Sequence, residues 1–454
     1  MKNSLFTFVF LLVSITANAY DAKINGIYYN LIPKGKVAFV TNGDVKYEGD
    51  ITIPSTIVHE GEEYNVKEIV NEACYNCSNL LSLMIPNSRT KIGDKAFYGC
   101  ERLKRLVLPD EMEELPNNMC GSCTQLTDVT LPSRLRTLSA GAFSDCVSLA
   151  SISLPEDLVE IGNGAFDNCI SLTSIVIPHH VSILGNSAFH SCINLASIRL
   201  PDNLSRIPNS CFATCLKLSE INLPDGIDAI GTDAFANCES LSHLTIPNSV
   251  TYIDSRAFAG SSLTSVDFLS TDTKIGEGLF TGCKQLTSIL SWPFTSVHRQ
   301  TFKDCTGLVD LEIPEGVELI DVSAFEGCTN LQTVIIPKSM QWIANWVFKD
   351  CQNLKDVYIY CENLPNGHNY SAFEGSYVEY ATLHVPASAL EVYRSTKPWS
   401  EFGSIVAIEG TGIEQVTWDK SQVTSEEWYT LEGIRVAQPR KGIYIHNGKK
   451  IILK

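Results

Sequence analysis

The 454-residue sequence lacks the common signatures of catalysis and of nucleotide binding. It contains no Gly-x-Ser-x-Gly, His-Glu-x-x-His, Gly-x-Gly-x-x-Gly or phosphate-binding loop. Basic residues are also scarce: 34 Lys and Arg face 51 Asp and Glu, for a formal charge of -17. Because an acidic surface repels phosphate backbones, we expect no nucleic-acid partner. We also expect no enzymatic activity, no cofactor, no catalytic residue and no metal site.

Long apolar runs are missing after the first residues, so we expect no transmembrane segment. The start itself has the order of a secretory signal. Lys2 provides the positive charge, the stretch from Leu5 to Ile15 is apolar, and Ala17-Asn18-Ala19 provides small residues for cleavage. The sequence therefore predicts a signal peptide at residues 1–19 and a mature chain that begins at Tyr20.

Cysteine, in contrast, is abundant and regularly spaced. A cysteine recurs every 23 residues from Cys77 to Cys238, and a proline recurs with the same period from Pro86 to Pro247. The register slips near Ser261 and resumes at Cys283, Cys305, Cys328 and Cys351. A period of roughly 20 to 29 residues with Leu-x-x-Ile-x-Ile spacing predicts a leucine-rich-repeat solenoid. We expect parallel strands in about 13 or 14 coils, capped at both ends.

Each column of the repeat has a physical role. Ile175 and Ile177 should point into the stack, so Val176 between them should point outward. The following proline should end the strand, because it has no N–H for a ladder. Phe166 is expected to fill the coil, and Gly185 to allow a tight turn.

The pattern Ala-Phe-x-x-Cys-x-x-Leu-x-x-Ile-x-Ile-Pro resembles the BspA-type (Treponema pallidum-like) leucine-rich repeats of bacterial surface proteins, including those of Bacteroidetes. The resemblance covers residues 66–385. It implies a strand-rich N-terminal cap at 20–65, a C-terminal cap at 386–410, and a β module at 411–454. That module is similar to modules of exported Bacteroidetes proteins, so it is either a sorting signal or a small hairpin cap. The position two residues after the proline varies, as Ser88, Glu111, Arg134, Asp157, His180 and Asn203, where commoner repeats keep asparagine, so no asparagine ladder is expected.

Sixteen cysteines in an exported chain raise the question of disulfides. Twelve of them share one column, where each lies beside its equivalents instead of facing a unique partner. We expect most to be buried free thiols acting as small apolar residues, with sporadic bridges as the alternative. Cys74-x-x-Cys77 and Cys120-x-x-Cys123 arise where cysteine replaces the column phenylalanine. The two pairs should lie two coils apart, roughly 10 Å, too far to share a zinc ion.

Two other motifs are weak. His179 and His180 are adjacent, and we expect them to point to opposite faces of a strand, which is unsuitable for chelation. The many serines recur in turns and solvent columns, and no His and Asp constellation is expected beside them.

The outward strand column varies from repeat to repeat while the core columns persist, as expected for a scaffold with a variable binding face. Aromatic residues concentrate in the C-terminal third, and exposed aromatics bind proteins or sugars. Together with the resemblance, these features predict an exported adhesion protein at the cell surface (outer membrane) or in the medium. It would bind an extracellular protein, and the alternative is a glycan-binding surface module. The candidate contact residues are Thr130, Ser153, Val176, Arg199, Asn222, Thr245, Trp292 and Trp342.

Overall fold

The computed structural model describes residues 20–87, 90–289, 292–367 and 370–408, and strands within 428–453. The predicted signal peptide at 1–19 lies outside the described residues. The chain divides into two compact units, Met1–Ala407 and Ile408–Lys454.

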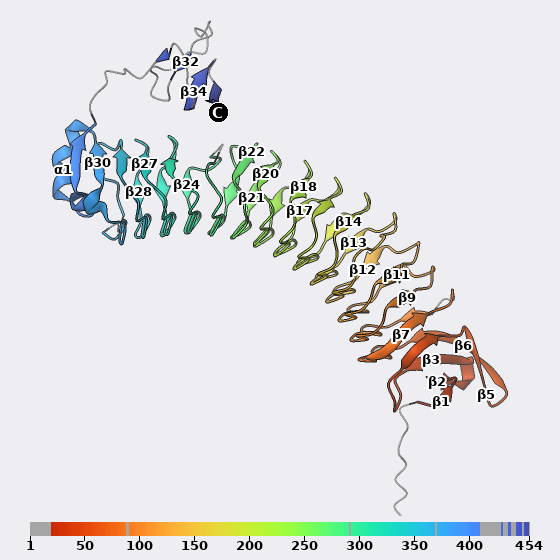
Figure 1. The fold of residues 1–454 in the computed structure, drawn as a ribbon. Coiled ribbons are helices and arrows are strands. Elements are labelled where there is room, and N and C mark those ends of the chain that lie inside the picture. The colour runs from red at the N-terminus through yellow and green to blue at the C-terminus, as the bar shows by residue number, and fades with distance from the viewer. Residues whose placement is uncertain are drawn as a thin grey trace, which may run out of the picture. The chain divides into compact units, whose positions relative to one another are not determined.

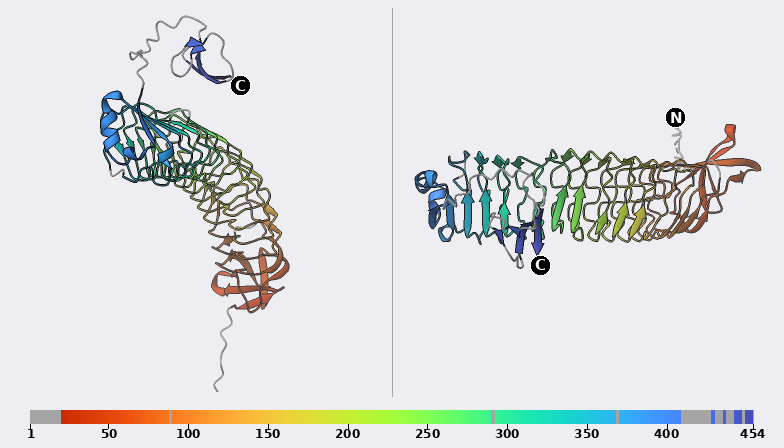
Figure 2. Two further views of the ribbon diagram at one scale, coloured as in Figure 1. Left: turned by 60° about the vertical axis from the view of Figure 1, so that its left-hand side comes forward. Right: turned by 90° about the horizontal axis from the view of Figure 1, so that it is seen from above.

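The first unit is a solenoid of parallel strands with about 15 turns and a spacing near 23 residues (Figure 1), so the predicted fold class is confirmed. Neighbouring strands pair in register one repeat apart, as Ile175 does with Ile198. The strands of successive coils therefore lie side by side along the unit (Figure 2).

The predicted strand of each coil forms a first ladder of four parallel sheets. Ile175 and Ile177 are buried while Val176 is 75% exposed, as the alternation predicts. The strands are β4 (Glu48–Thr52), β7 (Asn79–Met84), β9 (Arg105–Val107), β11 (Asp128–Thr130), β14 (Ser174–Val176), β16 (Ser197–Arg199), β18 (Glu220–Ile221), β20 (His243–Ile246), β22 (Ser265–Phe268), β25 (Asp310–Glu312), β27 (Thr333–Ile336), β29 (Asp356–Ile359), β30 (Thr382–Val385) and β31 (Ser404–Ala407).

A second parallel ladder, absent from the sequence prediction, follows the proline in each coil. Its strands are only two residues long, and one of the two side chains is usually buried, as Ile207 is in β17. They are β8 (Lys91–Ile92), β10 (Glu114–Leu115), β12 (Thr137–Leu138), β13 (Glu160–Ile161), β15 (Ile183–Leu184), β17 (Arg206–Ile207), β19 (Ala229–Ile230), β21 (Tyr252–Ile253), β23 (Lys274–Ile275), β24 (Ser296–Val297), β26 (Leu319–Ile320) and β28 (Trp342–Ile343).

The segments at the two ends of the solenoid join these ladders. At the N-terminal end, β6 pairs with β8 and β4 pairs with β7, both in parallel. At the C-terminal end, β31 pairs with β30, and Arg394 Nη2 donates a hydrogen bond to the Ile405 carbonyl at 3.1 Å. The remaining end elements are β1 (Ala22–Ile24), β2 (Ile27–Ile32), η1 (Pro33–Gly35), β3 (Val37–Thr41), β5 (Thr56–His59), β6 (Glu62–Ile69), η2 (Val378–Tyr380), η3 (Ala387–Ala389), α1 (Leu390–Ser395) and η4 (Trp399–Glu401).

The column phenylalanine forms the centre of the core. Ten consecutive ring pairs from Phe143 to Phe373 are stacked with centroids 5.2–5.8 Å apart. The stack continues through the stretch where the period slips, because Phe258, Phe280 and Phe302 remain in contact. The irregular segment thus changes the outside of the coil while the core stays continuous.

All sixteen cysteines are free and buried, as expected for the column. They also do more than fill space. In coil after coil the thiol donates a hydrogen bond to a Phe-column carbonyl of the preceding coil, as Cys169 does to Phe143, with Sγ···O distances of 3.1–3.3 Å. Each contact is weak, but the series runs along the stack. Cys74 and Cys120 occupy the Phe column as predicted and are also buried.

One sequence expectation about turns is wrong, and the structure adds to another. An asparagine ladder does exist, in a different column: Asn186 accepts at Oδ1 from the Asn209 N–H at 3.1 Å, and the same bond recurs between other coils. Gly185 begins a turn as expected, because its carbonyl accepts from the Ala188 N–H at 3.3 Å, and it also permits a close approach to the preceding coil. A Cβ at Gly185 would lie 2.3 Å from the Asn163 nitrogen of the preceding coil.

The described residues of the second unit form four antiparallel strands in the order β33-β32-β34-β35. Their bounds are β32 (Trp428–Tyr429), β33 (Arg435–Val436), β34 (Gly442–His446) and β35 (Lys449–Leu453). Antiparallel pairing distinguishes this sheet from the parallel ladders of the first unit.

Candidate functional site

The outward column of the first ladder faces solvent, because its residues alternate with the buried pair of each strand. Val176 is 75% exposed. The other predicted contact residues of this column are also exposed: Thr130, Ser153, Arg199, Asn222 and Thr245. Thr130, Val176, Arg199 and Thr245 lie on strands of the first ladder, whereas Asn222 directly follows β18 and Ser153 lies in a coil without a strand at this position.

Asn222 is partly committed to the scaffold. Its side-chain oxygen accepts from the Leu200 N–H at 3.0 Å, and its amide nitrogen donates to the Leu200 carbonyl at 3.2 Å. The strand β18 is only two residues long. At its end, the Asn222 side chain makes the two hydrogen bonds to the Leu200 backbone in place of the main chain. It is a weaker candidate for ligand contact than Arg199.

The ladder is hollowed where this short strand lies. A shallow depression of about 690 Å³ extends over β16, β18 and the start of β20. It is lined by Arg199 and Asn222 from the predicted column, and by Glu220 and His243 from the column two residues earlier. The remaining lining residues are Ser197, Ile198, Ser219, Ile221 and Ser242.

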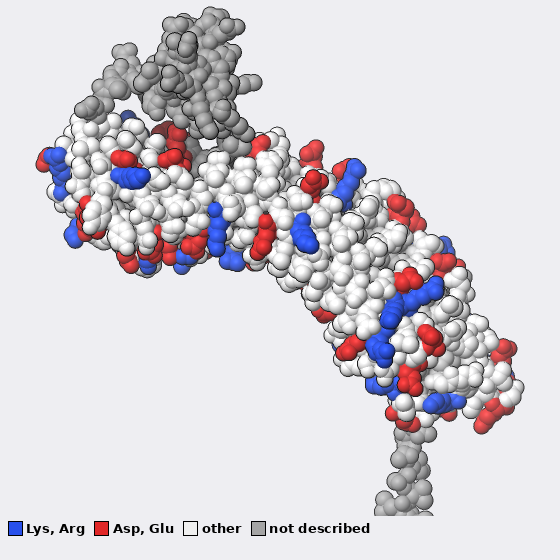
Figure 3. Space-filling view, in the orientation of Figure 1, with Lys and Arg blue, Asp and Glu red and all other residues white. Residues whose placement is uncertain are grey.

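An ion pair on this surface joins neighbouring coils. Arg105 of β9 bridges Asp128 of β11 at 3.2 Å. On the face drawn in Figure 3, basic and acidic side chains are accordingly interspersed. Arg199 differs, since it forms no ion pair with any described residue. Its guanidinium remains available for a partner's carboxylate.

The two predicted tryptophans lie elsewhere. Trp292 is half-buried, with its ring centroid 5.1 Å from Phe294 and 5.7 Å from Phe302. Because its ring packs in the core of the irregular coil, Trp292 is a weaker candidate for ligand contact. Trp342 is 40% exposed in the second ladder, at β28.

The expected arrangement of the histidine pair is wrong. His179 and His180 follow Pro178 in a turn, and their ring centroids lie 3.8 Å apart. His179 pairs with Glu156 at 3.4 Å, and His180 contacts the Glu156 carbonyl at 3.1 Å. Both rings are thus held against the preceding coil.

A serine, a histidine and an aspartate also meet, contrary to expectation. His190 Nδ1 lies 2.7 Å from Asp167 Oδ1, and its Nε2 lies 3.5 Å from Ser191 Oγ. The neighbouring backbone donors are already used: the Ser191 N–H bonds Ala213 at 2.8 Å and the Cys192 N–H bonds Phe189 at 3.3 Å. The His190–Asp167 contact joins neighbouring coils.

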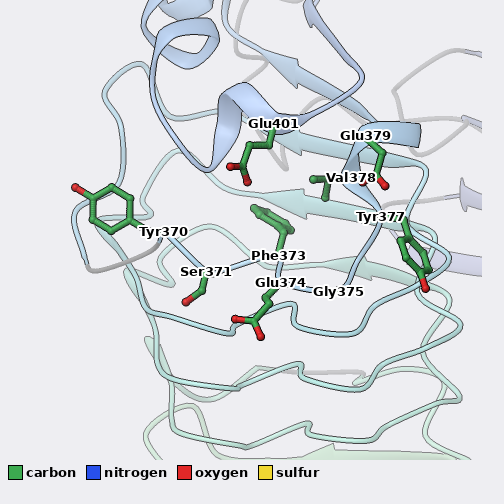
Figure 4. Close-up of a pocket in the computed structure, with 9 residues that line it drawn as sticks. All are labelled: Tyr370, Ser371, Phe373, Glu374, Gly375, Tyr377, Val378, Glu379 and Glu401. Atoms are coloured by element: carbon green, nitrogen blue, oxygen red, sulfur yellow. The ribbon is translucent and has the colours of Figure 1, made fainter.

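A second depression, of about 560 Å³, lies near the C-terminal end of the solenoid (Figure 4). Its polar lining comes from Tyr370, Glu374, Tyr377, Glu379 and Glu401. The sequence indicated aromatic enrichment in this third of the chain, but not that these residues share one groove.

Comparisons with known proteins agree with this architecture. The family described as the BspA type leucine rich repeat region, in 6 copies, matches residues 62–172, 159–287 and 287–395. A leucine-rich repeat protein from Bacteroides ovatus is similar in structure, with 25% identity and a TM-score of 0.66, over 86% of this chain and 100% of that one.

Two further structures are similar to parts of the chain. The T. pallidum leucine rich repeat protein has 31% identity over 49% of this chain and 90% of its own, with a TM-score of 0.35. A leucine rich cell surface protein from Faecalibacterium prausnitzii has 24% identity over 74% of this chain and 94% of its own, with a TM-score of 0.47. No curated protein matches the sequence.

Proposed function

Because the chain belongs to the BspA-type leucine-rich-repeat family, we propose that it is an exported surface protein that binds an extracellular protein through its first ladder. The observation that carries the proposal is the exposed, variable outward column, with an unpaired Arg199 in a depression over β16, β18 and β20. Binding of this kind needs contact area and charge complementarity, and no chemistry.

The partner would carry an acidic group opposite Arg199 and an apolar group opposite Val176. Val176 keeps 75% of its surface exposed although it lies one strand from Arg199. The family resemblance points to host matrix proteins, other bacteria or mucosal surfaces. Surface plasmon resonance of residues 20–454 over immobilised fibronectin, fibrinogen and laminin tests this. We expect saturable binding to at least one of them, at least tenfold weaker for Val176→Asp. Absence of binding, or equal binding by the variant, would refute the proposal.

Export is part of the same proposal. No helix in the described part of the chain is long and apolar enough to cross a membrane. Intact-mass analysis of the protein recovered from its own cells should show a chain that begins at Tyr20, because the small residues before it fit signal cleavage. A chain that retains residues 1–19 would contradict export by this signal. If the chain is exported, residues 411–454 act in surface retention or sorting, or as a cap.

A second candidate function, saccharide binding, is favoured by the exposed aromatic side chains near the C-terminal depression. Tyr370 is 75% exposed and Tyr377 is 52% exposed. Such rings stack on sugars and on protein side chains alike, so the geometry around them decides between the two.

A further inference from the structure

Two aromatic residues near the C-terminal depression have unusual backbone conformations. Trp346 has φ 59° and Tyr377 has φ 50°. They are the only aromatic residues among the described non-glycine residues with positive φ. For a bulky side chain this left-handed region is strained. Other coils place small or polar residues at the Trp346 position: Ser187, Ser210, Asp233, Gln300 and Ser323.

The Trp346 ring is fixed although it is 41% exposed. Its Nε1 donates to Glu374 Oε2 at 3.0 Å. Lys349 Nζ lies 5.7 Å from the ring centroid and 3.5 Å from Glu374 Oε1. These contacts hold the indole in one orientation before any ligand arrives. The left-handed backbone recurs in this column, so the feature particular to this coil is a large aromatic ring that is held in place at the surface.

Glu374 connects this ring to the groove of Figure 4. In that view Tyr370 and Tyr377 lie on opposite sides, with Glu374 and Glu401 between them. The groove volume of about 560 Å³ is within the usual range of ligand sites, roughly 300–1,000 Å³. Trp346 is thus hydrogen-bonded to a residue that lines a groove with a tyrosine on each side.

The charge balance of the groove selects the class of ligand. Glu374 is paired with Lys349, and Glu401 is paired with Lys397 at 2.8 Å. Among the described residues only Glu379 of the three carboxylates has no ion-pair partner. A cationic ligand therefore gains little, while an anionic one meets three carboxylates. To a neutral ligand the groove offers carboxylate oxygens that accept hydrogen bonds and that lie between aromatic rings.

We propose that this groove binds a neutral saccharide, with hexopyranose rings stacked on Tyr370, Tyr377 and Trp346. Aromatic rings fit the C–H faces of pyranoses, and the carboxylates accept hydrogen bonds from the hydroxyls. The inference rests on the second candidate function above and is independent of the first-ladder site.

Isothermal titration of residues 20–454 tests it, with neutral gluco-, manno- and galacto-tetraoses as probes, and with sialyllactose and tetralysine as charged probes. We expect binding of at least one neutral tetraose. Trp346→Asn and Tyr377→Asn should each weaken it at least tenfold without lowering the thermal midpoint, because asparagine tolerates the left-handed conformation. Tyr370→Ala, which removes a ring that is 75% exposed, should also weaken tetraose binding.

Gln300→Asn is the matched control, since Gln300 occupies the Trp346 column two coils earlier with φ 57°. It should leave both binding and midpoint unchanged, and Arg199→Glu should leave saccharide binding unchanged. Preference for sialyllactose or tetralysine, no binding of any neutral tetraose, or unchanged binding by both asparagine variants would overturn the proposal. If the unaltered chain binds a neutral tetraose but no matrix protein, only the first-ladder site is refuted.

Discussion

Above pH 9 the free energy of unfolding should fall steeply. Fifteen of the sixteen thiols have a raised pKa in the folded chain. Burial raises the pKa of Cys192, Cys238 and Cys328 to about 12, from an ordinary value of 9.0. Cys77 is the exception, because hydrogen bonds from Cys100 and Cys74 lower its pKa.

The direction of the pH dependence follows from linkage. A thiol with a raised folded pKa contributes stability that is fully present below its unfolded pKa and is lost as the pH rises toward the folded pKa. The window therefore begins near pH 9 and extends to about 12 for the three thiols above. Within it each buried thiol removes about 1.4 kcal/mol per pH unit. Because the column contains many such thiols, their losses of unfolding free energy add.

Urea unfolding followed by circular dichroism at pH 8, 9, 10 and 11, with a phosphine reductant, measures this slope. A variant with alanine at Cys169, Cys192, Cys215 and Cys238 should lose stability less steeply, by roughly 5 kcal/mol per pH unit in the middle of the window. Ile207→Val with Ile230→Val is the control: it should lower stability at every pH without changing the slope. Stability that stays flat to pH 11 would show that the thiols are not buried as described.

Replacing Phe189 with cysteine should cost about 3 kcal/mol, since it opens a cavity in the middle of the ring stack. Phe189 is fully buried between Phe166 and Phe212, at 5.4 and 5.8 Å. The chain itself shows a compensation, because Cys120 replaces the column phenylalanine next to a buried Met119. Ala188→Met added to Phe189→Cys should therefore recover most of the loss.

The four proteins of this double-mutant cycle separate packing from general damage. Ala188→Met alone should destabilise by about 1–3 kcal/mol, because it overfills a coil that retains its phenylalanine. Chemical denaturation of all four gives the coupling energy. A strictly additive result would mean that residues 188 and 189 do not share one space in the core.

The repeat period was enough to predict the solenoid, because each core column recurs with the same side-chain type. The alternation of Ile175, Val176 and Ile177 was likewise enough to predict which residues face outward. The second ladder was missed because its strands are two residues long and present one buried side chain, too little for a recognisable period. The thiol hydrogen bonds were missed because a buried cysteine and a small apolar residue have the same sequence pattern.

The site was less predictable, for physical reasons. The role of Trp292 depends on how the irregular coil packs, which the slipped period leaves open. The commitment of Asn222 to Leu200 depends on a strand that stops one residue early. The left-handed backbone at Trp346 is shared by every coil, and the sequence predicts no left-handed conformation for a tryptophan.

Partner binding on the first ladder is tested most directly by comparing two charge reversals. Arg199 and Arg206 are exposed arginines seven residues apart, on β16 of the first ladder and β17 of the second. Arg199→Glu and Arg206→Glu make the same change of charge on the two ladders. Surface plasmon resonance over the matrix protein that binds the unaltered chain should show at least tenfold weaker binding for Arg199→Glu and unchanged binding for Arg206→Glu. Equal losses in both variants, or a loss confined to Arg206→Glu, would contradict a binding site on the first ladder.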